Sequence, residues 1–335
     1  MRVSMHSNVG LVGCARIIVE KMAQVEVGER VLVVTDYTYS SKRLANLVFE
    51  TSIAQGAESA IINSPPPTGS FAAGSISPIA QAAADTSDAI FACTGAAFPL
   101  PVTRGLVKKG KRVMQMHFLN DDLVLRTVPI DLELLQRRAN KLLTVLPHTQ
   151  KVHMTSAEGS DLTFSLDGCK FALVYDGMCR QGEFDAVPAG AIGTLPVPYT
   201  GNGVIVIDGS VDGYGLVRSP IRLSIKDGQI TKVEGDGPEA VWLDRAMKKQ
   251  LVAGDKNANH WAEFVIGLNP SAQVCGSVLE DERHLGAVSI GWGRDTHLGG
   301  TFDSLSHGDA SLVNPTITID NVTIIEDGRP TRELS

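Results

Sequence analysis

Apolar runs of strand length alternate with amphipathic segments through roughly the first 145 residues of the chain. Residues 30–35 (RVLVVT) are almost entirely apolar, which is typical of a strand buried on both faces of a sheet. Residues 40–55 follow, with Leu44, Leu47 and Val48 at near-helical spacing. Because strands that alternate with helices pair in parallel, this region predicts a mostly parallel sheet flanked by helices. The other segments expected here are strands at 57–63, 89–93 and 111–116, and helices at 8–24, 78–84 and 132–146.

The pattern changes near residue 150, where helical periodicity gives way to frequent turns. Asp-Gly pairs at 167–168, 208–209 and 227–228 separate short runs rich in β-branched residues, as in antiparallel hairpins. We therefore expect an α/β protein with two domains: an α/β domain at 1–148, and an α+β domain rich in antiparallel strands at 149–335. The second domain is expected to contain strands at 152–155, 162–166, 204–208, 221–225 and 316–319, and one helix at 238–251.

Net charge and cysteine usage narrow the classes of function. The net charge of −7 disfavours nucleic acid and anionic membranes as partners, and no apolar run is long enough to span a bilayer. The five cysteines are widely spaced and odd in number, which favours unpaired thiols in a reducing cytoplasm. Neither a phosphate-binding glycine fingerprint nor a Gly-x-Ser-x-Gly nucleophile elbow occurs. We therefore expect a cytoplasmic protein whose partner is neither nucleic acid nor a membrane.

The triplet His307-Gly308-Asp309 is the strongest candidate for chemistry. On an extended backbone, side chains at i and i+2 project from one face, so the imidazole and the carboxylate can point at the same ion. Glu263 lies upstream in an apolar run, where a carboxylate is costly unless it is paired or coordinated. Three ligands with open coordination positions are what a catalytic metal needs. The alternative is that Glu263 simply occupies the exposed face of a half-buried strand.

Several motifs occur in one order in the last quarter of the chain. They are 262–270 (AEFVIGLNP), 279–283 (LEDER), 286–293 (GAVSIGWG), 299–300 (GG) and 306–309 (SHGD). This order resembles the metal-dependent aminopeptidases of the M29 type and their relatives, the iron-dependent 2,5-dihydroxypyridine 5,6-dioxygenases. The resemblance implies that Glu263, His307 and Asp309 are metal ligands, and it also implies a homo-oligomer.

Two positions depart from the two-metal pattern of the aminopeptidases. Ala191 and Ser289 stand where that family carries a further glutamate and a histidine as ligands. Alanine cannot ligate and serine is a poor ligand for a divalent metal, so one metal ion is expected. Glu263 stands where the dioxygenases carry their first histidine, which leaves one histidine and two carboxylates. Fe(II) is favoured, Zn(II) and Mn(II) are alternatives, and His260 could ligate if its segment were helical.

The resemblance implies a mononuclear metal-dependent enzyme that acts on a small molecule. The favoured activity is Fe(II)-dependent, ring-cleaving dioxygenation of a hydroxylated N-heterocycle similar to 2,5-dihydroxypyridine. The first alternative is an aminopeptidase-like amide hydrolase, in which the metal activates water and Glu280 or Glu282 acts as the base. The second alternative, motivated by the missing ligands, is a non-catalytic small-molecule-binding protein with a vestigial site.

Overall fold

The computed structural model of the chain describes residues 5–335, with side chains from residue 9 onward. The chain divides into two compact units: the first holds the residues up to Asp131 together with Gly177–Ala189, and the second holds Leu132–Asp176 together with Gly190–Ser335. Helix α6 (Leu132–Val145) groups with the second unit, whereas the sequence placed it in the first domain. A division into folding domains at residue 148 stays a prediction.

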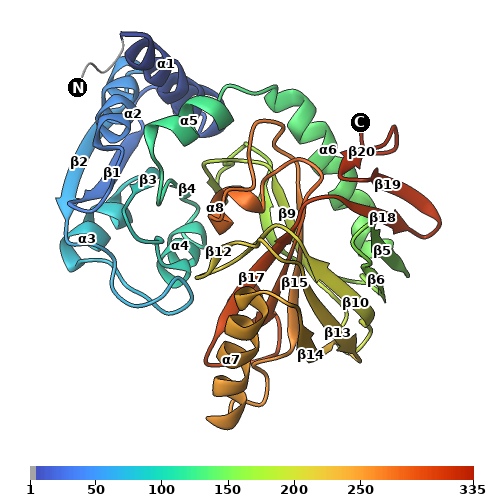
Figure 1. Cartoon of the computed structure of the whole chain (residues 1–335). Coiled ribbons are helices and arrows are strands. Elements are labelled where there is room, and N and C mark those ends of the chain that lie inside the picture. The colour runs from blue at the N-terminus through green and yellow to red at the C-terminus, as the bar shows by residue number, and fades with distance from the viewer. Residues whose placement is uncertain (1–4) are drawn as a thin grey trace. The chain divides into compact units, whose positions relative to one another are not determined.

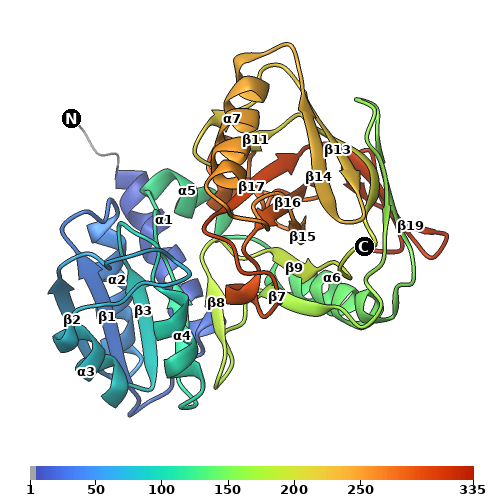
Figure 2. The same cartoon turned by 90° about the horizontal axis from the view of Figure 1, so that it is seen from below.

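A parallel sheet with strand order β2-β1-β3-β4-β8 forms the first unit. Helices α3 and α4 pack on one face, where Leu32, Ala84 and Ile90 share a core cluster, and α2 covers the other face (Figures 1 and 2). The strands are β1 (Arg30–Asp36), β2 (Glu58–Ser64), β3 (Ala89–Cys93), β4 (Arg112–Gln115) and β8 (Phe184–Ala186). The helices are α1 (Met5–Arg16), continued by a π-helical turn (Ile17–Met22), α2 (Lys42–Ala54), α3 (Pro78–Thr86), α4 (Leu100–Val107) and α5 (Asp121–Thr127).

Asp36, at the carboxyl end of β1, ties together the loops that follow β1 and β3. Its Oδ1 accepts hydrogen bonds from the backbone N–H groups of Thr38 and Tyr39 at 2.8 and 3.0 Å, and its Oδ2 accepts from Gly95 at 3.0 Å. A Cβ at Gly95 would lie 2.1 Å from the Thr38 hydroxyl oxygen, so the two loops touch directly. This is the point where the strand order reverses and where ligands bind in many such sheets. Here the carboxylate of Asp36 is used to join the loops.

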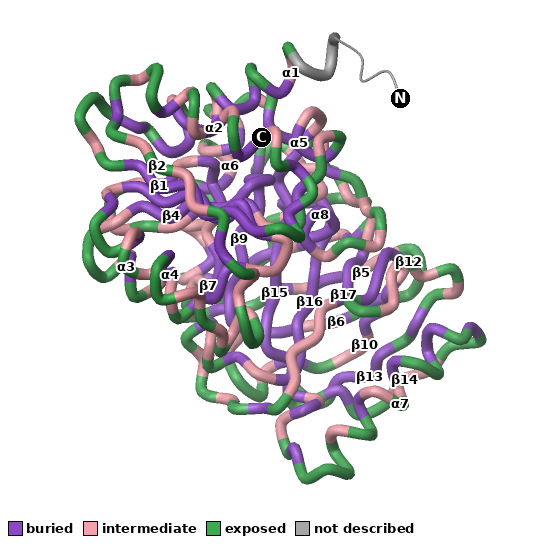
Figure 3. The backbone as a smooth tube through the Cα atoms, turned by 90° about the vertical axis from the view of Figure 1, so that its left-hand side faces the viewer, coloured by how far each residue is buried: buried purple, intermediate pink, exposed green. Residues whose placement is uncertain are grey.

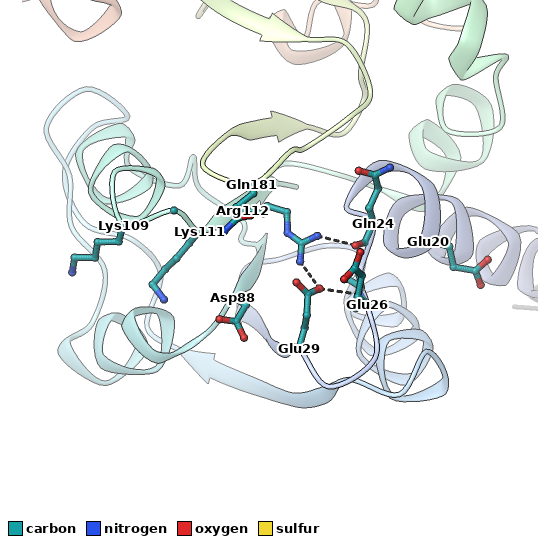
Figure 4. Close-up of a pocket in the computed structure, with 11 residues that line it drawn as sticks. Glu20, Gln24, Glu26, Glu29, Asp88, Lys109, Lys111, Arg112 and Gln181 are labelled. Carbon is teal, nitrogen blue, oxygen red and sulfur yellow. Dashed lines mark hydrogen bonds and ion pairs between the residues drawn. The ribbon is translucent and has the colours of Figure 1, made fainter.

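Arg112 organises a polar cavity of about 630 Å³ in the first unit (Figure 4). Its guanidinium donates to the carbonyl oxygens of Ala23 at 2.7 Å and Gln24 at 2.8 Å, and it pairs with Glu29. Figure 4 shows the contacts of Arg112 with Gln24 and Glu29, which both lie in the segment that precedes β1. Buried arginine contacts of this kind fix backbone position, so we assign Arg112 a structural role.

Two antiparallel sheets form the second unit, with strand orders β14-β13-β10-β6-β5-β18-β19-β20 and β12-β11-β17-β16-β15-β9-β7. The strands are β5 (Val152–Ser156), β6 (Asp161–Phe164), β7 (Lys170–Tyr175), β9 (Ala191–Leu195), β10 (Asn202–Ile207), β11 (Ser210–Val211), β12 (Gly215–Leu216), β13 (Ile221–Lys226), β14 (Gln229–Glu234), β15 (Trp261–Gly267), β16 (Val288–Gly293), β17 (His307–Leu312), β18 (Pro315–Ile319), β19 (Val322–Glu326) and β20 (Arg329–Pro330). The helices besides α6 are α7 (Pro238–Val252), α8 (Val278–Asp281) and two 3₁₀ turns, η2 (Leu146–His148) and η3 (Thr296–Leu298).

Aromatic side chains join the two sheets of the second unit. The ring of Phe164 on β6 packs edge-on against Trp261 and Phe264 of β15, with ring centroids 4.6 and 5.0 Å apart. Strands β15 and β16 are buried along their whole length (Figure 3). The predicted α/β class, with a parallel sheet followed by antiparallel structure, is confirmed. Among the described residues, the helices are too short or too polar to cross a membrane.

Candidate metal centre

Glu263, His307 and Asp309 come together on one face of the seven-stranded sheet. Glu263 belongs to β15, and His307 and Asp309 are the first and third residues of β17. Strand β16 lies between them, with Gly291 paired to both Glu263 and Asp309. One ligand atom from each of the three side chains lies within 4.8 Å of the other two. The structure thus brings these sequence-predicted residues together, and their binding of a metal stays a prediction.

The three side chains differ in depth. Only 3% of Glu263 is exposed, whereas the side chains of His307 and Asp309 are 21% and 17% exposed. His307 Nε2 lies 3.3 Å from Asp309 Oδ1 and 3.9 Å from Glu263 Oε2. An ion that arrives from solvent therefore meets His307 and Asp309 before it reaches the buried carboxylate.

Two glycines leave room for the carboxylate of Glu263. A Cβ at Gly291 would lie 2.9 Å from Asp309 Oδ1, 3.0 Å from Glu263 Cβ and 3.2 Å from His307 Cε1. A Cβ at Gly193 on β9 would lie 2.8 Å from Glu263 Oε1. The space among the three candidate ligands therefore depends on the absence of side chains at these positions. A β-bulge between Trp261 and Glu263 interrupts the pairing of β15 with β16 just before the buried carboxylate.

A hydrogen bond orients the ring of His307. Its Nδ1 lies 2.6 Å from the carbonyl oxygen of Arg294, an acceptor, so Nδ1 carries the hydrogen and donates it. In the neutral ring this leaves the lone pair on Nε2, the nitrogen that faces Glu263 and Asp309. The ring of His297 on η3 packs edge-on against His307, with centroids 4.8 Å apart. A metal-binding imidazole usually donates its other N–H to a backbone carbonyl or a carboxylate. The hydrogen bond from His307 Nδ1 to the Arg294 carbonyl is a contact of this kind.

The electrostatics of the cluster favour a cation. Burial, reinforced by the charge of Asp309, raises the pKa of Glu263 to about 8 against the opposing charges of His307 and Arg283. Burial acts to lower the pKa of His307, but the charge and hydrogen bond of Asp309, the charge of Glu263 and the Arg294 carbonyl raise it to about 9. Glu263 Oε1 is buried without a hydrogen-bond partner. A set of one nitrogen and two carboxylates, one of them with a buried oxygen that has no hydrogen-bond partner, fits a single divalent metal ion.

Ala191 and Ser289 lie on the same sheet, on β9 and β16. Ala191 pairs with Gly267 of β15, and the hydroxyls of Ser289 and Ser311 lie 2.8 Å apart. The Ser289 hydroxyl therefore bonds within the sheet. Within the described part of the chain, Glu263, His307 and Asp309 form the one cluster of at least three histidine, cysteine or acidic side chains close enough to share an ion.

His260 does not belong to this cluster, and the interpretation of His260 as a ligand is wrong for a physical reason. It required a helical segment, but residues Trp261–Gly267 form strand β15. The His260 ring is buried and stacks on Phe302, with centroids 3.4 Å apart and planes at 28°. Phe302 lies in the loop between η3 and β17, so the His260 ring packs against that loop.

Glu280 and Glu282, the sequence candidates for a base, have partners around α8. Glu280 accepts a hydrogen bond from the backbone N–H of Gln273 at 2.8 Å, and Glu282 pairs with Arg283. Between them, Asp281 accepts hydrogen bonds from Ser210 Oγ and from the backbone N–H groups of Cys275 and Gly276. These contacts hold the loop before α8 in place, and a role in proton transfer for Glu280 or Glu282 stays a prediction.

The sequence did not lead us to predict that Gly193 and Gly291 make room for the Glu263 carboxylate, or that the Arg294 carbonyl orients His307. The sequence did contain a signal for Gly291, because Gly291 and Gly293 alternate with Trp292 along a strand. Trp292 faces the other side of the sheet, where a Cβ at Gly308 would lie 2.7 Å from its indole. A glycine is therefore required inside the His-x-Asp triplet as well.

The fold and the Glu-His-Asp cluster together define the class of the protein as a candidate metalloenzyme. The chain belongs to the 2,5-dihydroxypyridine 5,6-dioxygenase family, whose model matches residues 17–332. A curated 2,5-dihydroxypyridine 5,6-dioxygenase from Pseudomonas putida strain KT2440 is 25% identical over 240 residues, which cover 68% of this chain and 67% of the relative. The family and this relative support a dioxygenase-like enzyme.

Two solved structures share the fold. The 2,5-dihydroxypyridine dioxygenase from Pseudomonas putida KT2440 matches with a TM-score of 0.82 at 22% identity, covering 100% of both chains. Wild-type AmpT from Thermus thermophilus matches with a TM-score of 0.71 at 15% identity, covering 97% of this chain and 99% of its own. The predicted resemblance to the aminopeptidase superfamily, on the dioxygenase branch, is confirmed.

Proposed function

We propose that the protein is a mononuclear, Fe(II)-dependent dioxygenase that cleaves the ring of a hydroxylated N-heterocycle similar to 2,5-dihydroxypyridine. The observation that carries this proposal is the convergence of Glu263, His307 and Asp309 in a member of the 2,5-dihydroxypyridine 5,6-dioxygenase family. Zn(II) and Mn(II) suit the same donor set, so the choice of Fe(II) rests on the reaction named for the relatives.

Each of the three residues has a distinct part in this proposal. Glu263 and Asp309 supply two negative charges against the two positive charges of the ion, and His307 supplies a neutral nitrogen through Nε2. When bound, Fe(II) would supply a centre that holds a substrate hydroxyl beside dioxygen. The protein holds its ligands on β15 and β17, and the pairing of both strands with β16 keeps their separation fixed while the substrate enters from the side of His307 and Asp309.

We place this chemistry in the second unit, which contains all three residues. The five cysteines are free thiols, in keeping with the reducing cytoplasm that we propose as the location. A homo-oligomer is likewise proposed from the resemblance to the family.

Metal analysis of protein purified without oxygen, followed by oxygen uptake with 2,5-dihydroxypyridine, tests the proposal. We expect about one iron per chain and oxygen consumption that depends on both the metal and the dihydroxypyridine. Bound zinc with hydrolysis of peptides or amides would support the aminopeptidase-like alternative. We retain this alternative because the chain shares its fold with AmpT. Ligand binding without any metal, undisturbed by His307→Ala, would support the non-catalytic alternative.

A further inference from the structure

A third carboxylate, Asp212, lies beside the candidate metal centre. It directly follows strand β11, which pairs with β17 in the register Ser210 to Ser311 and Val211 to Ala310. Continuing that register puts Asp212 opposite Asp309, and the Asp212 N–H donates to the Asp309 carbonyl at 2.8 Å. Figure 2 shows β11, β17, β16 and β15 as neighbours in one sheet.

Directly opposed residues of antiparallel strands project their side chains from the same face, with Cβ atoms about 4.5–5.5 Å apart. Asp212, the first residue of the turn between β11 and β12, continues the register of β11 by one residue and therefore lies next to the row formed by Glu263, Gly291 and Asp309. Asp212 is exposed to solvent, and the side chains of the neighbouring His307 and Asp309 are partly exposed. A molecule bound between the exposed ligands and solvent would lie next to Asp212.

Asp212 is not one of the residues that converge on the ion. Within the described residues, the group whose ligand atoms lie within 4.8 Å of one another consists of Glu263, His307 and Asp309. Two carboxylates that face each other across a strand pair repel and destabilise the pairing. A cation or a hydrogen-bond donor between them would relieve that repulsion.

A hydroxylated N-heterocycle supplies such a donor. In its lactam form, a 2-hydroxypyridine carries an N–H group adjacent to the carbon that bears the oxygen. An oxygen held at the metal therefore leaves the ring N–H a few ångströms away, comparable with the spacing of about 5 Å between cross-strand neighbours.

We propose that Asp212 is a specificity-determining residue that accepts a hydrogen bond from the ring N–H of the substrate. This inference rests on the function proposed above. It adds that the enzyme recognises the nitrogen of the ring and distinguishes an N-heterocycle from a carbocycle with the same hydroxyls.

Binding measured without turnover tests the inference. The full chain is loaded with Zn(II), which is redox-inert, and titrated without oxygen with 2,5-dihydroxypyridine and with hydroquinone, which has two hydroxyls in the same relation but no ring nitrogen. We expect the wild type to prefer the dihydroxypyridine, and Asp212→Ala to reduce that preference at least about tenfold, as expected for a lost charge-assisted hydrogen bond. Zinc content is expected to stay unchanged. Asp236→Ala, an exposed aspartate of the same unit, is the matched control.

The outcomes separate the inference from the proposed function. An unchanged preference in zinc-loaded Asp212→Ala would overturn the role of Asp212 while leaving the dioxygenase proposal standing. Loss of zinc from Asp212→Ala would make Asp212 a ligand and overturn its role in specificity. Zinc-loaded wild type that shows no preference for the dihydroxypyridine would overturn the inference, and oxygen uptake by the iron-loaded wild type decides separately whether the dioxygenase proposal stands.

Discussion

Glu263 and Asp309 face each other across Gly291, the residue of β16 that pairs with both of them. Any side chain at position 291 would lie between the two carboxylates, close to Asp309 Oδ1 and Glu263 Cβ. The separation of the two candidate ligands is thus set by sheet geometry, and the space between them is set by the missing side chain. The metal site that we propose depends on all three strands.

Gly291→Ala is expected to lower metal occupancy while the protein stays folded. The new methyl group displaces Asp309 Oδ1, which lies at the mobile end of a side chain, and presses on Glu263 Cβ, which is less free to move. We expect at least a tenfold loss of apparent metal affinity, measured by titration with Fe(II) or Zn(II). Gly105→Ala is the control, because a Cβ there meets nothing within 4 Å and the residue lies in helix α4. Equal metal affinity in the two variants would argue against the site.

Asp309→Ala is expected to abolish retention of the metal. The substitution removes one of three donors and leaves the backbone pairing of β17 with β16 intact. The expected loss of affinity exceeds the roughly 10- to 100-fold typical of residues that only support ligands. Metal content per chain after gel filtration measures it, with circular dichroism as the check on folding. A folded variant with full metal content would show that the triad is assigned wrongly.

The stability of the second unit is expected to fall between pH 6.5 and pH 4 because of His260. Burial lowers the pKa of His260 to about 4 from its usual 6.5. Above pH 6.5 the ring is neutral in both folded and unfolded chains, so it contributes no pH dependence. As the pH falls towards 4, the unfolded chain takes up a proton that the folded chain does not, and stability declines by about 2–3 kcal/mol.

Urea unfolding at pH 7.5 and pH 4.5, followed by tryptophan fluorescence, measures this change. The fluorescence reports the second unit, which contains Trp242, Trp261 and Trp292. His260→Gln is expected to show a pH dependence smaller by about 2–3 kcal/mol. His148→Gln, which alters an exposed histidine of the same unit, is expected to behave as the wild type. If wild type and His260→Gln showed the same pH dependence, His260 would not be the cause of the loss of stability at low pH.

Asp281→Asn is expected to loosen the loop that precedes α8. The fully buried carboxylate accepts hydrogen bonds from Ser210 Oγ at 2.6 Å, from Cys275 N–H at 2.7 Å and from Gly276 N–H at 3.1 Å. An amide cannot accept all three equally well, so we expect a loss of about 2–3 kcal/mol in local stability. Hydrogen exchange at Cys275 and Gly276 should accelerate by about 30- to 100-fold. Asp327→Asn, at an exposed turn, should leave these two amides unchanged.

Features that depend on neighbouring residues in the chain could be predicted, and features that depend on strand pairing could not. The apolar run of β1 and the i, i+2 spacing of His307 and Asp309 are local, so the sequence contains them. The place of Gly291 between two ligands and that of Asp212 beside Asp309 follow from register, which joins residues far apart in sequence. The short strand β8 was missed for the same reason, since its three residues gain their conformation by pairing with β4.

Strand β8 also sets the order in which the protein can be assembled during synthesis. Its partner β4 ends at Gln115, but β8 begins only at Phe184, so the outer edge of β4 lacks its neighbour while the intervening chain is made. At about 5–20 residues per second, that interval is on the order of ten seconds. An unpaired strand edge is a template for association with other chains. A ribosome that pauses within this stretch would therefore carry a nascent chain with an unpaired strand edge, and we expect slow codons between the two strands to lower the yield of folded protein.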